Sequence, residues 1–254
     1  MKTIRMKSAV KHLILPIIMS TISLGAVAQS KIAFEVSFTE PQAHYVDVEM
    51  EISGNKKDQL DIKMPVWAPG SYLVREFAKN VEGFTASADK GNNLITEKIN
   101  KNTWRVKAGK ADHIKINYRV YAFEPSVRTS FVDASHAFLS PTGIFMYLDG
   151  AIKHSATITI NQVKGWNKIS TGLENVRGKA NTFYAPDFDI LYDSPIEAGN
   201  QDVFEFDAAG AAVGIRIATV AATLIADLAD GGDADQGCPA MGDERQRDAR
   251  DRHD

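Results

Sequence analysis

Cysteine is almost absent from this sequence, because Cys238 is the only one in 254 residues. A single thiol forms no internal disulfide, and a zinc site built from several cysteines is excluded with it. None of the six histidines is followed by glutamate, so the His-Glu-x-x-His helix motif of zinc hydrolases is also absent. The sequence therefore carries no signal of its own for a catalytic metal.

An excess of positive charge is missing too. The chain holds 29 Lys and Arg against 32 Asp and Glu, and four of these cations lie in residues 1–28, so the remainder has a net charge near −7. Nucleic acid is not an expected partner, because phosphate binding needs a cationic surface. The apolar share of 44% and the charged share of 24% are ordinary for a globular protein and exclude wholesale disorder.

The first 28 residues have the pattern of an export signal. A basic stretch precedes the apolar run Leu13–Ala28, which ends in the small-x-small sequence Ala26-Val27-Ala28. We predict a signal peptide over 1–28, cleaved after Ala28. A membrane anchor is the alternative, but the run contains Pro16 and Gly25 and is shorter than the ~20 apolar residues of a span. Export without disulfides indicates a periplasmic or secreted protein of a Gram-negative bacterium, free of the membrane after cleavage.

Strand-like alternation of apolar and polar residues dominates the following part of the chain. Each alternating segment has one face suited to a core and one suited to water. The segments are 32–38, 46–52, 60–64, 104–106, 114–120, 156–160 and 190–192. Turn-rich stretches separate them and no long amphipathic helix intervenes. We predict an all-β fold, an antiparallel multi-stranded β-sandwich.

Composition changes abruptly after Gly210. Residues 211–254 contain no Lys, Phe, Tyr or Trp and consist largely of Ala, Asp and Gly. We predict a folded domain over 29–209 and an aberrant, largely disordered tail over 210–254, in which only Val213–Leu228 is apolar enough to pack as a helix. The abruptness favours translation in a shifted frame; a natural disordered tail is the alternative.

Three separated stretches carry a resemblance to a known family. They are Met64–Phe77 (MPVWAPGSYLVREF, with Asn80 just beyond), Tyr121–Leu148 and Asp187–Gly199. In this order they resemble the N-terminal domain of metallopeptidase family sixty-one, the glycyl aminopeptidases, and the resemblance covers about residues 31–209. It implies a β-sandwich that precedes a thermolysin-like zinc catalytic domain and, commonly, a PDZ module. Members remove N-terminal glycine or alanine from peptides.

The resemblance stops where the catalytic module would begin, at Phe204–Asp207. We therefore expect a chain truncated before its catalytic domain, with no catalytic residue, no metal site and no cofactor of its own, although the full-length family uses zinc. Its expected partner is the missing catalytic metallopeptidase domain, with peptides as indirect partners. The alternative is a free-standing secreted β-sandwich module that binds peptide or glycan through aromatic-rich loops.

The residues expected to face the catalytic domain or border its peptide cleft come from the first two stretches. They are Trp67, Tyr72, Arg75, Glu76, Arg128, Asp133, His136 and Tyr147. Pro69 and Gly70 predict a rigid turn beside Trp67. Arg75 and Arg128 are forked donors, and the alternative to an interface is internal ion pairing with Glu76, Glu124 or Asp133.

Other residues in these stretches have simpler expected roles. His136 and Asp133 supply only two candidate ligands, which is too few for a zinc site. The carboxylates Asp187, Asp189, Asp193 and Glu197 are expected on the wet face of a last strand and in the turn after it, not as a catalytic pair. The aromatic loop Phe131–Tyr147 is expected to expose an apolar patch that a partner covers; the alternative is a further strand pair that packs inward.

Overall fold

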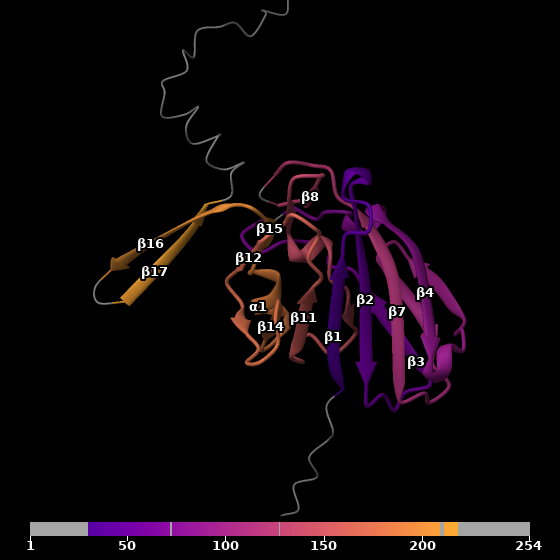
Figure 1. The fold of residues 1–254 in the computed structure, drawn as a ribbon. Coiled ribbons are helices and arrows are strands. Elements are labelled where there is room, and N and C mark those ends of the chain that lie inside the picture. Colours follow the sequence, from indigo (N-terminus) through magenta and orange to yellow (C-terminus); the bar gives the residue numbers. More distant parts are fainter. Residues whose placement is uncertain (1–29, 72, 127, 209–210, 218–254) are drawn as a thin grey trace, which may run out of the picture.

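The computed structural model describes residues 30–217 except 72, 127 and 209–210, and within them strands dominate (Figure 1). The predicted signal peptide with its Ala28 cleavage site, Tyr72 and residues 218–254 lie outside the described residues. None of the described helices is long and apolar enough to cross a membrane. The chain is all-β, as the alternation predicts.

A large sheet of seven strands forms one layer of the sandwich. Its order is β13 (Glu174–Asn175), β14 (Thr182–Ala185), β11 (Ala156–Ile160), β1 (Lys31–Ser37), β2 (Tyr45–Ser53), β7 (His113–Tyr121) and β4 (Val81–Ala88). Neighbouring strands are antiparallel except for β1 and β11, which run parallel, with Phe34 opposite Ile158. The predicted antiparallel arrangement therefore holds for every described strand pair but this one.

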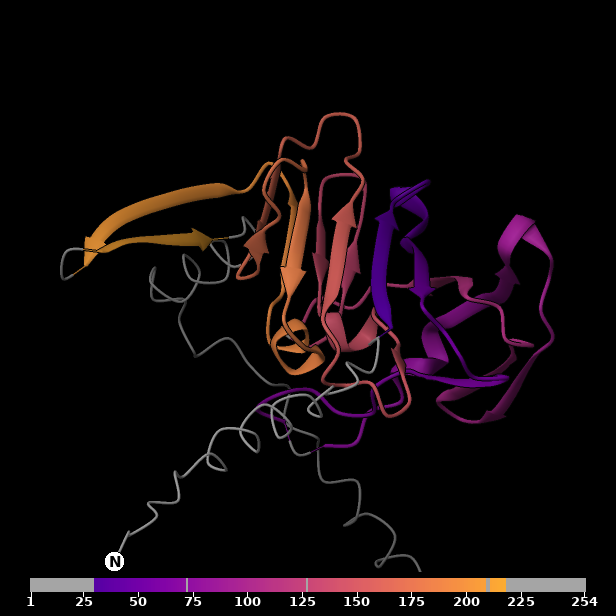
Figure 2. The same ribbon diagram turned by 90° about the horizontal axis from the view of Figure 1, so that it is seen from below.

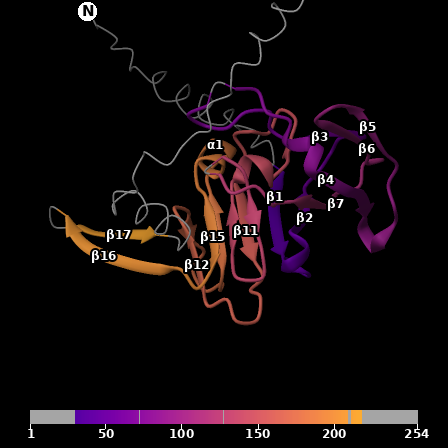
Figure 3. The ribbon, with the colours of Figure 1, turned by 90° about the horizontal axis from the view of Figure 1, so that it is seen from above.

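Two smaller sheets form the second layer. One has the order β10 (Tyr147–Leu148), β3 (Gln59–Lys63), β6 (Thr103–Lys107), β5 (Thr96–Asn100), and the other β12 (Lys168–Thr171), β15 (Ile196–Gly199), β9 (Ala137–Leu139), β8 (Phe131–Val132). The Phe84 ring of β4 lies 5.2 Å from the Trp104 ring of β6, and Phe38 after β1 lies 5.2 Å from Trp166 before β12. Both small sheets thus pack on the large one (Figures 2 and 3).

Short helices and one hairpin complete the fold. The helices are η1 (Pro41–Ala43), η2 (Phe77–Asn80), η3 (Asp89–Gly91), η4 (Pro141–Gly143) and α1 (Phe188–Tyr192). Strands β16 (Asp202–Ala208) and β17 (Ala211–Ile217) pair with each other in a hairpin that projects from the sandwich (Figures 1 and 3). The prediction of a helix that starts at Val213 is wrong for residues 213–217, because they belong to the extended strand β17, which pairs with β16.

The buried core consists of the alternating residues identified in the sequence. Val36, Val46, Met50, Ile52 and Ile116 are completely buried, each at an inward position of the large sheet. Register keeps them together: Phe34 lies opposite Met50, which in turn lies opposite Ile116. Burial of apolar surface at about 25 cal/mol per Å² makes this inner face the main source of stability.

The segment predicted as a last strand at 190–192 is the helix α1 instead. Asp187 caps it by accepting a hydrogen bond on Oδ1 from the backbone N–H of Ile190 at 2.9 Å. Phe188 and Leu191, three residues apart, are both fully buried, which is a helical spacing. The expected wet strand face for Asp187 and Asp189 is therefore wrong, and both carboxylates lie on a helical turn.

The aromatic loop Phe131–Tyr147 does not expose the expected patch. Phe145 and Met146 are completely buried, and the Phe145 ring meets Phe34 edge-on at 4.9 Å. Phe131, Phe138 and Tyr147 are half-buried. The turn η4 directs residues 141–146 into the core. The number of aromatic residues in the loop does not predict this course of the chain.

Candidate functional site

The loop between β3 and η2 is a firmly held structure on the surface. Asn102 fixes its start, since its side-chain amide donates to the Met64 carbonyl at 2.8 Å. The Ser71 N–H donates to the Ala68 carbonyl at 3.1 Å across Pro69-Gly70, and Gly70 has φ +71°, the geometry of a type II turn. The rigid turn predicted from Pro69 and Gly70 is confirmed.

Large apolar side chains of this loop point outward. Trp67 is 57% exposed, Leu73 63% and Val74 71%. The Arg75 N–H donates to the Val66 carbonyl at 2.6 Å, so the loop is closed on itself where these side chains emerge. Their exposure is therefore a property of an ordered loop.

Buried tyrosines hold the segment that lies beneath this loop. The Tyr118 hydroxyl donates to the Ile144 carbonyl at 2.8 Å and accepts from the Met146 N–H at 3.2 Å. The Tyr192 hydroxyl donates to the Phe145 carbonyl at 3.2 Å. Burial raises the pKa of both tyrosines, so both stay neutral donors far above physiological pH.

A cavity of about 390 Å³ lies between this loop and α1. Figures 2 and 3 show the loop running alongside α1. The walls of the cavity are mostly apolar, and all three stretches that carry the family resemblance contribute residues to them. The lining residues are Pro65, Val66, Trp67, Pro69, Thr142, Tyr147, Ile152, Asp189, Ile190, Tyr192 and Asp193.

Carboxylates of α1 and one lysine set the charge at the cavity edge. Lys153 contacts Asp189 and lies 3.4 Å from Asp187, and the hydrogen bond that its ammonium donates to Asp189 raises the pKa of Lys153. The N–H of Ile190 lowers the pKa of the Asp187 carboxyl, with Lys153 adding to the effect. Asp193 takes part in no ion pair among the residues that the structure describes.

Trp67 and Tyr147 are the two predicted site residues that line this cavity. Glu76 lies outside it in an exposed ion pair with Lys101 at 2.5 Å, whose hydrogen bond lowers the Glu76 pKa. Arg75 is half-buried and Arg128 exposed. Neither arginine joins an ion pair within the described part of the chain, so their expected pairing with Glu76, Glu124 or Asp133 is wrong.

Asp133 and His136 form a structural turn between β8 and β9. The Asp133 Oδ1 accepts from the N–H of Ser135 at 2.7 Å and of His136 at 3.1 Å. Burial alone would raise the Asp133 pKa, but these bonds and the Ser135 hydroxyl outweigh it, and the pKa is lowered. His136 packs against Gly199, where an added Cβ would lie 2.8 Å from the His136 Cβ. This pair does not fit a zinc ion, and no group of three metal-ligating side chains occurs among the described residues.

Next to this turn lies an aromatic ladder that sequence reasoning missed. The Phe123 ring stacks on His44 at 3.7 Å on one side and on Phe131 at 5.2 Å on the other, and Phe131 continues to His136 at 5.3 Å. His44 has φ +66°, and its Nδ1 lies 2.7 Å from the Val132 carbonyl, to which it donates. The Phe123 ring is thus engaged by two neighbouring rings, His44 and Phe131, within the fold.

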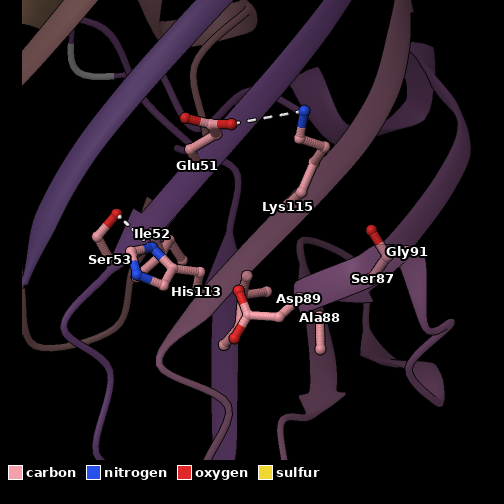
Figure 4. Close-up of a pocket in the computed structure, with 10 residues that line it drawn as sticks. Glu51, Ile52, Ser53, Ser87, Ala88, Asp89, Gly91, His113 and Lys115 are labelled. Atoms are coloured by element: carbon pink, nitrogen blue, oxygen red, sulfur yellow. Dashed lines mark hydrogen bonds and ion pairs between the residues drawn. The ribbon is translucent and has the colours of Figure 1, made fainter.

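A polar hollow of about 340 Å³ lies on the outer face of the large sheet (Figure 4). Lys115 pairs there with Glu49 at 2.6 Å and Glu51 at 3.5 Å, and the hydrogen bond that Lys115 donates to Glu49 raises the pKa of Lys115. The His113 Nδ1 lies 3.1 Å from the Ser53 hydroxyl. Lys115 is thus neutralised by its neighbours on β2, and the hollow lies on the polar outer face of β2, β7 and β4.

Comparisons with known proteins give a family and several solved structures. A family model described as the peptidase M61 N-terminal domain matches residues 33–200. No curated protein matches the chain. The crystal structure of an aminopeptidase N family protein from Idiomarina loihiensis is similar with a TM-score of 0.69 and 26% sequence identity, over 78% of this chain and 35% of that protein. The chain thus spans about a third of that relative's length.

Proposed function

Because the chain belongs to the peptidase M61 N-terminal domain family, we propose that it is the non-catalytic front domain of an exported, glycyl aminopeptidase-like zinc metallopeptidase. In this proposal the domain acts in the periplasm and supports the substrate cleft of a catalytic domain. Zinc belongs to that catalytic domain, since the described residues here supply no fitting ligand set.

The observation that carries the proposal is the clustering of exposed apolar side chains around the Trp67 cavity. We define the Trp67 face as Trp67, Leu73, Val74, Ile152 and Ile190, which are between 38% and 71% exposed. Trp67, Ile152 and Ile190 line the cavity, and Leu73 and Val74 belong to the same loop as Trp67. Exposed apolar side chains gathered on one loop and the cavity beside it are typical of protein interaction sites.

The length of the relative supports the same assignment. The Idiomarina protein is described as an aminopeptidase N family protein, and this chain matches 35% of it. We place the catalytic centre outside the shared segment, because no zinc-binding motif occurs in the matching sequence here. The Trp67 face is then the surface on which the catalytic domain rests.

A free-standing peptide- or glycan-binding module is less well supported. A sugar-binding platform presents the free face of an aromatic ring, whereas the Phe123 ring already stacks on His44 and on Phe131. The aromatic-rich loops therefore favour internal packing.

A chimera tests the proposed function. Residues 33–200 of this chain replace the matching segment of the Idiomarina protein, and chelator-sensitive release of arylamine from glycyl- and alanyl-arylamides is measured. We expect the chimera to turn over substrate and this chain alone, supplied with zinc, to show none. Trp67→Ser should lower kcat/KM about tenfold, or ~1.4 kcal/mol.

Ile95→Ser is the matched control, because Ile95 is 65% exposed and lies outside the Trp67 face. It should leave the chimera's activity unchanged. Equal effects of the two substitutions, or chelator-sensitive turnover by the chain alone, would contradict the proposal. If the chimera does not fold, sedimentation of the isolated chain decides: Trp67→Ser should reduce self-association and Ile95→Ser should not.

A further inference from the structure

The Trp67 cavity combines aromatic rings with negative charge and lacks cations. Trp67, Tyr147 and Tyr192 contribute rings, and Asp189 and Asp193 contribute carboxylates. No Lys, Arg or His occurs among the described residues that line it. The cavity is therefore electrostatically suited to a positively charged group.

One of its two carboxylates is available. Asp189 is engaged by Lys153, whereas Asp193 has no ion-pair partner in the described part of the chain. Trp67, the residue type with the most favourable face for a cation, stacks on no other described aromatic ring. The cavity is thus lined by a carboxylate without an ion-pair partner and by an indole without a stacked aromatic neighbour among the described residues.

We propose that this cavity receives a basic side chain, lysine or arginine, carried by the polypeptide that covers the Trp67 face. The inference rests on the proposed function and names the chemistry of its partner: the catalytic domain presents a cation at this point of the interface. The aliphatic stem of that side chain packs on Ile152, Ile190 and Pro69 while its charged head meets Asp193.

Contact between a cation and an aromatic ring occurs twice among the described residues, once together with a carboxylate. The Arg119 guanidinium lies 4.2 Å from the Tyr45 ring centroid and 2.8 Å from the Glu82 carboxylate. The Lys98 ammonium lies 4.5 Å from the Trp104 ring centroid. In each case a ring face takes the cation, and at Tyr45 a carboxylate completes the site as Asp193 does in the cavity.

Other occupants fit less well. A purely apolar side chain would remove water from Asp193 without pairing its charge, which is unfavourable. An anionic group would be repelled by Asp193, the carboxylate that Lys153 does not neutralise. A volume of about 390 Å³ lies within the usual range of ligand pockets and is large enough for a long basic side chain.

The test titrates the isolated chain with three small probes: the amides of N-acetyl-arginine, N-acetyl-norleucine and N-acetyl-glutamate. Indole N–H signals in NMR spectra report binding, and Trp104 and Trp166 serve as internal references because both are buried. We expect the arginine probe to shift the Trp67 signal saturably and to bind about fivefold more tightly than the norleucine probe. The glutamate probe should bind least.

Asp193→Asn should remove the preference for the arginine probe over the norleucine probe. Asp58→Asn, at an exposed acid outside the cavity, should retain it. Equal binding of both probes by the unaltered chain, no shift of the Trp67 signal, or a preference that survives Asp193→Asn would overturn the inference. These results would overturn the inference about the basic side chain but not the proposed function, which the chimera experiment tests separately. A chimera whose activity does not respond to Trp67→Ser would refute the proposed function.

Discussion

Replacing Tyr118 with phenylalanine removes one buried hydroxyl and leaves the ring in place. That hydroxyl donates to the Ile144 carbonyl and accepts from the Met146 N–H, and both residues are completely buried. Each backbone group left without a partner costs about 1–3 kcal/mol, so we expect Tyr118→Phe to lower the free energy of unfolding by about 3 kcal/mol. The midpoint of thermal unfolding should fall by roughly 6–12 °C for a domain of this size.

Urea unfolding followed by circular dichroism measures this loss. Tyr184→Phe is the control, because Tyr184 is 39% exposed and its hydroxyl has no hydrogen bond with the described residues. It should change stability by less than about 0.5 kcal/mol. A similarly small loss for Tyr118→Phe would refute the reasoning, since Ile144 and Met146 would then have to find other partners.

Alkaline titration provides a second readout of the same residue. Burial raises the pKa of Tyr118 above that of an unfolded tyrosine, near 10, so the folded state favours the neutral hydroxyl. This contribution is complete below pH ~10 and is lost as the pH rises towards the folded pKa. Tyr118→Phe should therefore flatten the fall of stability above pH ~10 by up to ~1.4 kcal/mol per pH unit, while Tyr192 continues to contribute.

Three further substitutions examine the surroundings of the site. Asp187→Ala removes the cap of α1 and should cost about 1 kcal/mol in urea unfolding; no loss would mean that the cap bond is replaced. Gly199→Ala places a Cβ 2.8 Å from that of His136 and should cost about 1–3 kcal/mol, whereas Gly172→Ala, 3.8 Å from its nearest neighbour, should be close to neutral. Val74→Ser, at a 71% exposed position, should raise solubility and leave stability within about 0.5 kcal/mol; a larger loss would place Val74 in the core.

Alternation predicted the strands that are long and have one buried face, namely β1, β2, β3, β6, β7 and β11. It missed β4, where the register shifts between Glu82 and Thr85 and breaks the period. Strands of two or three residues, such as β8 and β10, are too short to carry a period. Ile190 and Tyr192 imitate strand alternation, but the buried pair Phe188 and Leu191 sets the helical turn.

The candidate site could be predicted only in part for a similar reason. Motif order brought Trp67 and Tyr147 into one set, and both line the cavity. Opposite charges in the sequence did not predict the ion pairs, because a sequence does not give the distances between side chains. Glu76, for example, pairs with Lys101, which lies in a turn between β5 and β6. The stacking of His44 on Phe123 depends on how a turn meets a loop 79 residues away in sequence, which neither periodicity nor composition records.

The exposure of the Trp67 face does not follow from poor packing behind it. The carbonyl groups of Ile144 and Phe145 beneath the cavity are both bound by tyrosine hydroxyls, and Pro141 to Met146 are all buried. Trp67 is nevertheless 57% exposed on a turn-stabilised loop. Covering this indole would contribute about 25 cal/mol per Å² of apolar surface removed from water. Under the proposed function, that contribution is realised when the catalytic domain covers Trp67.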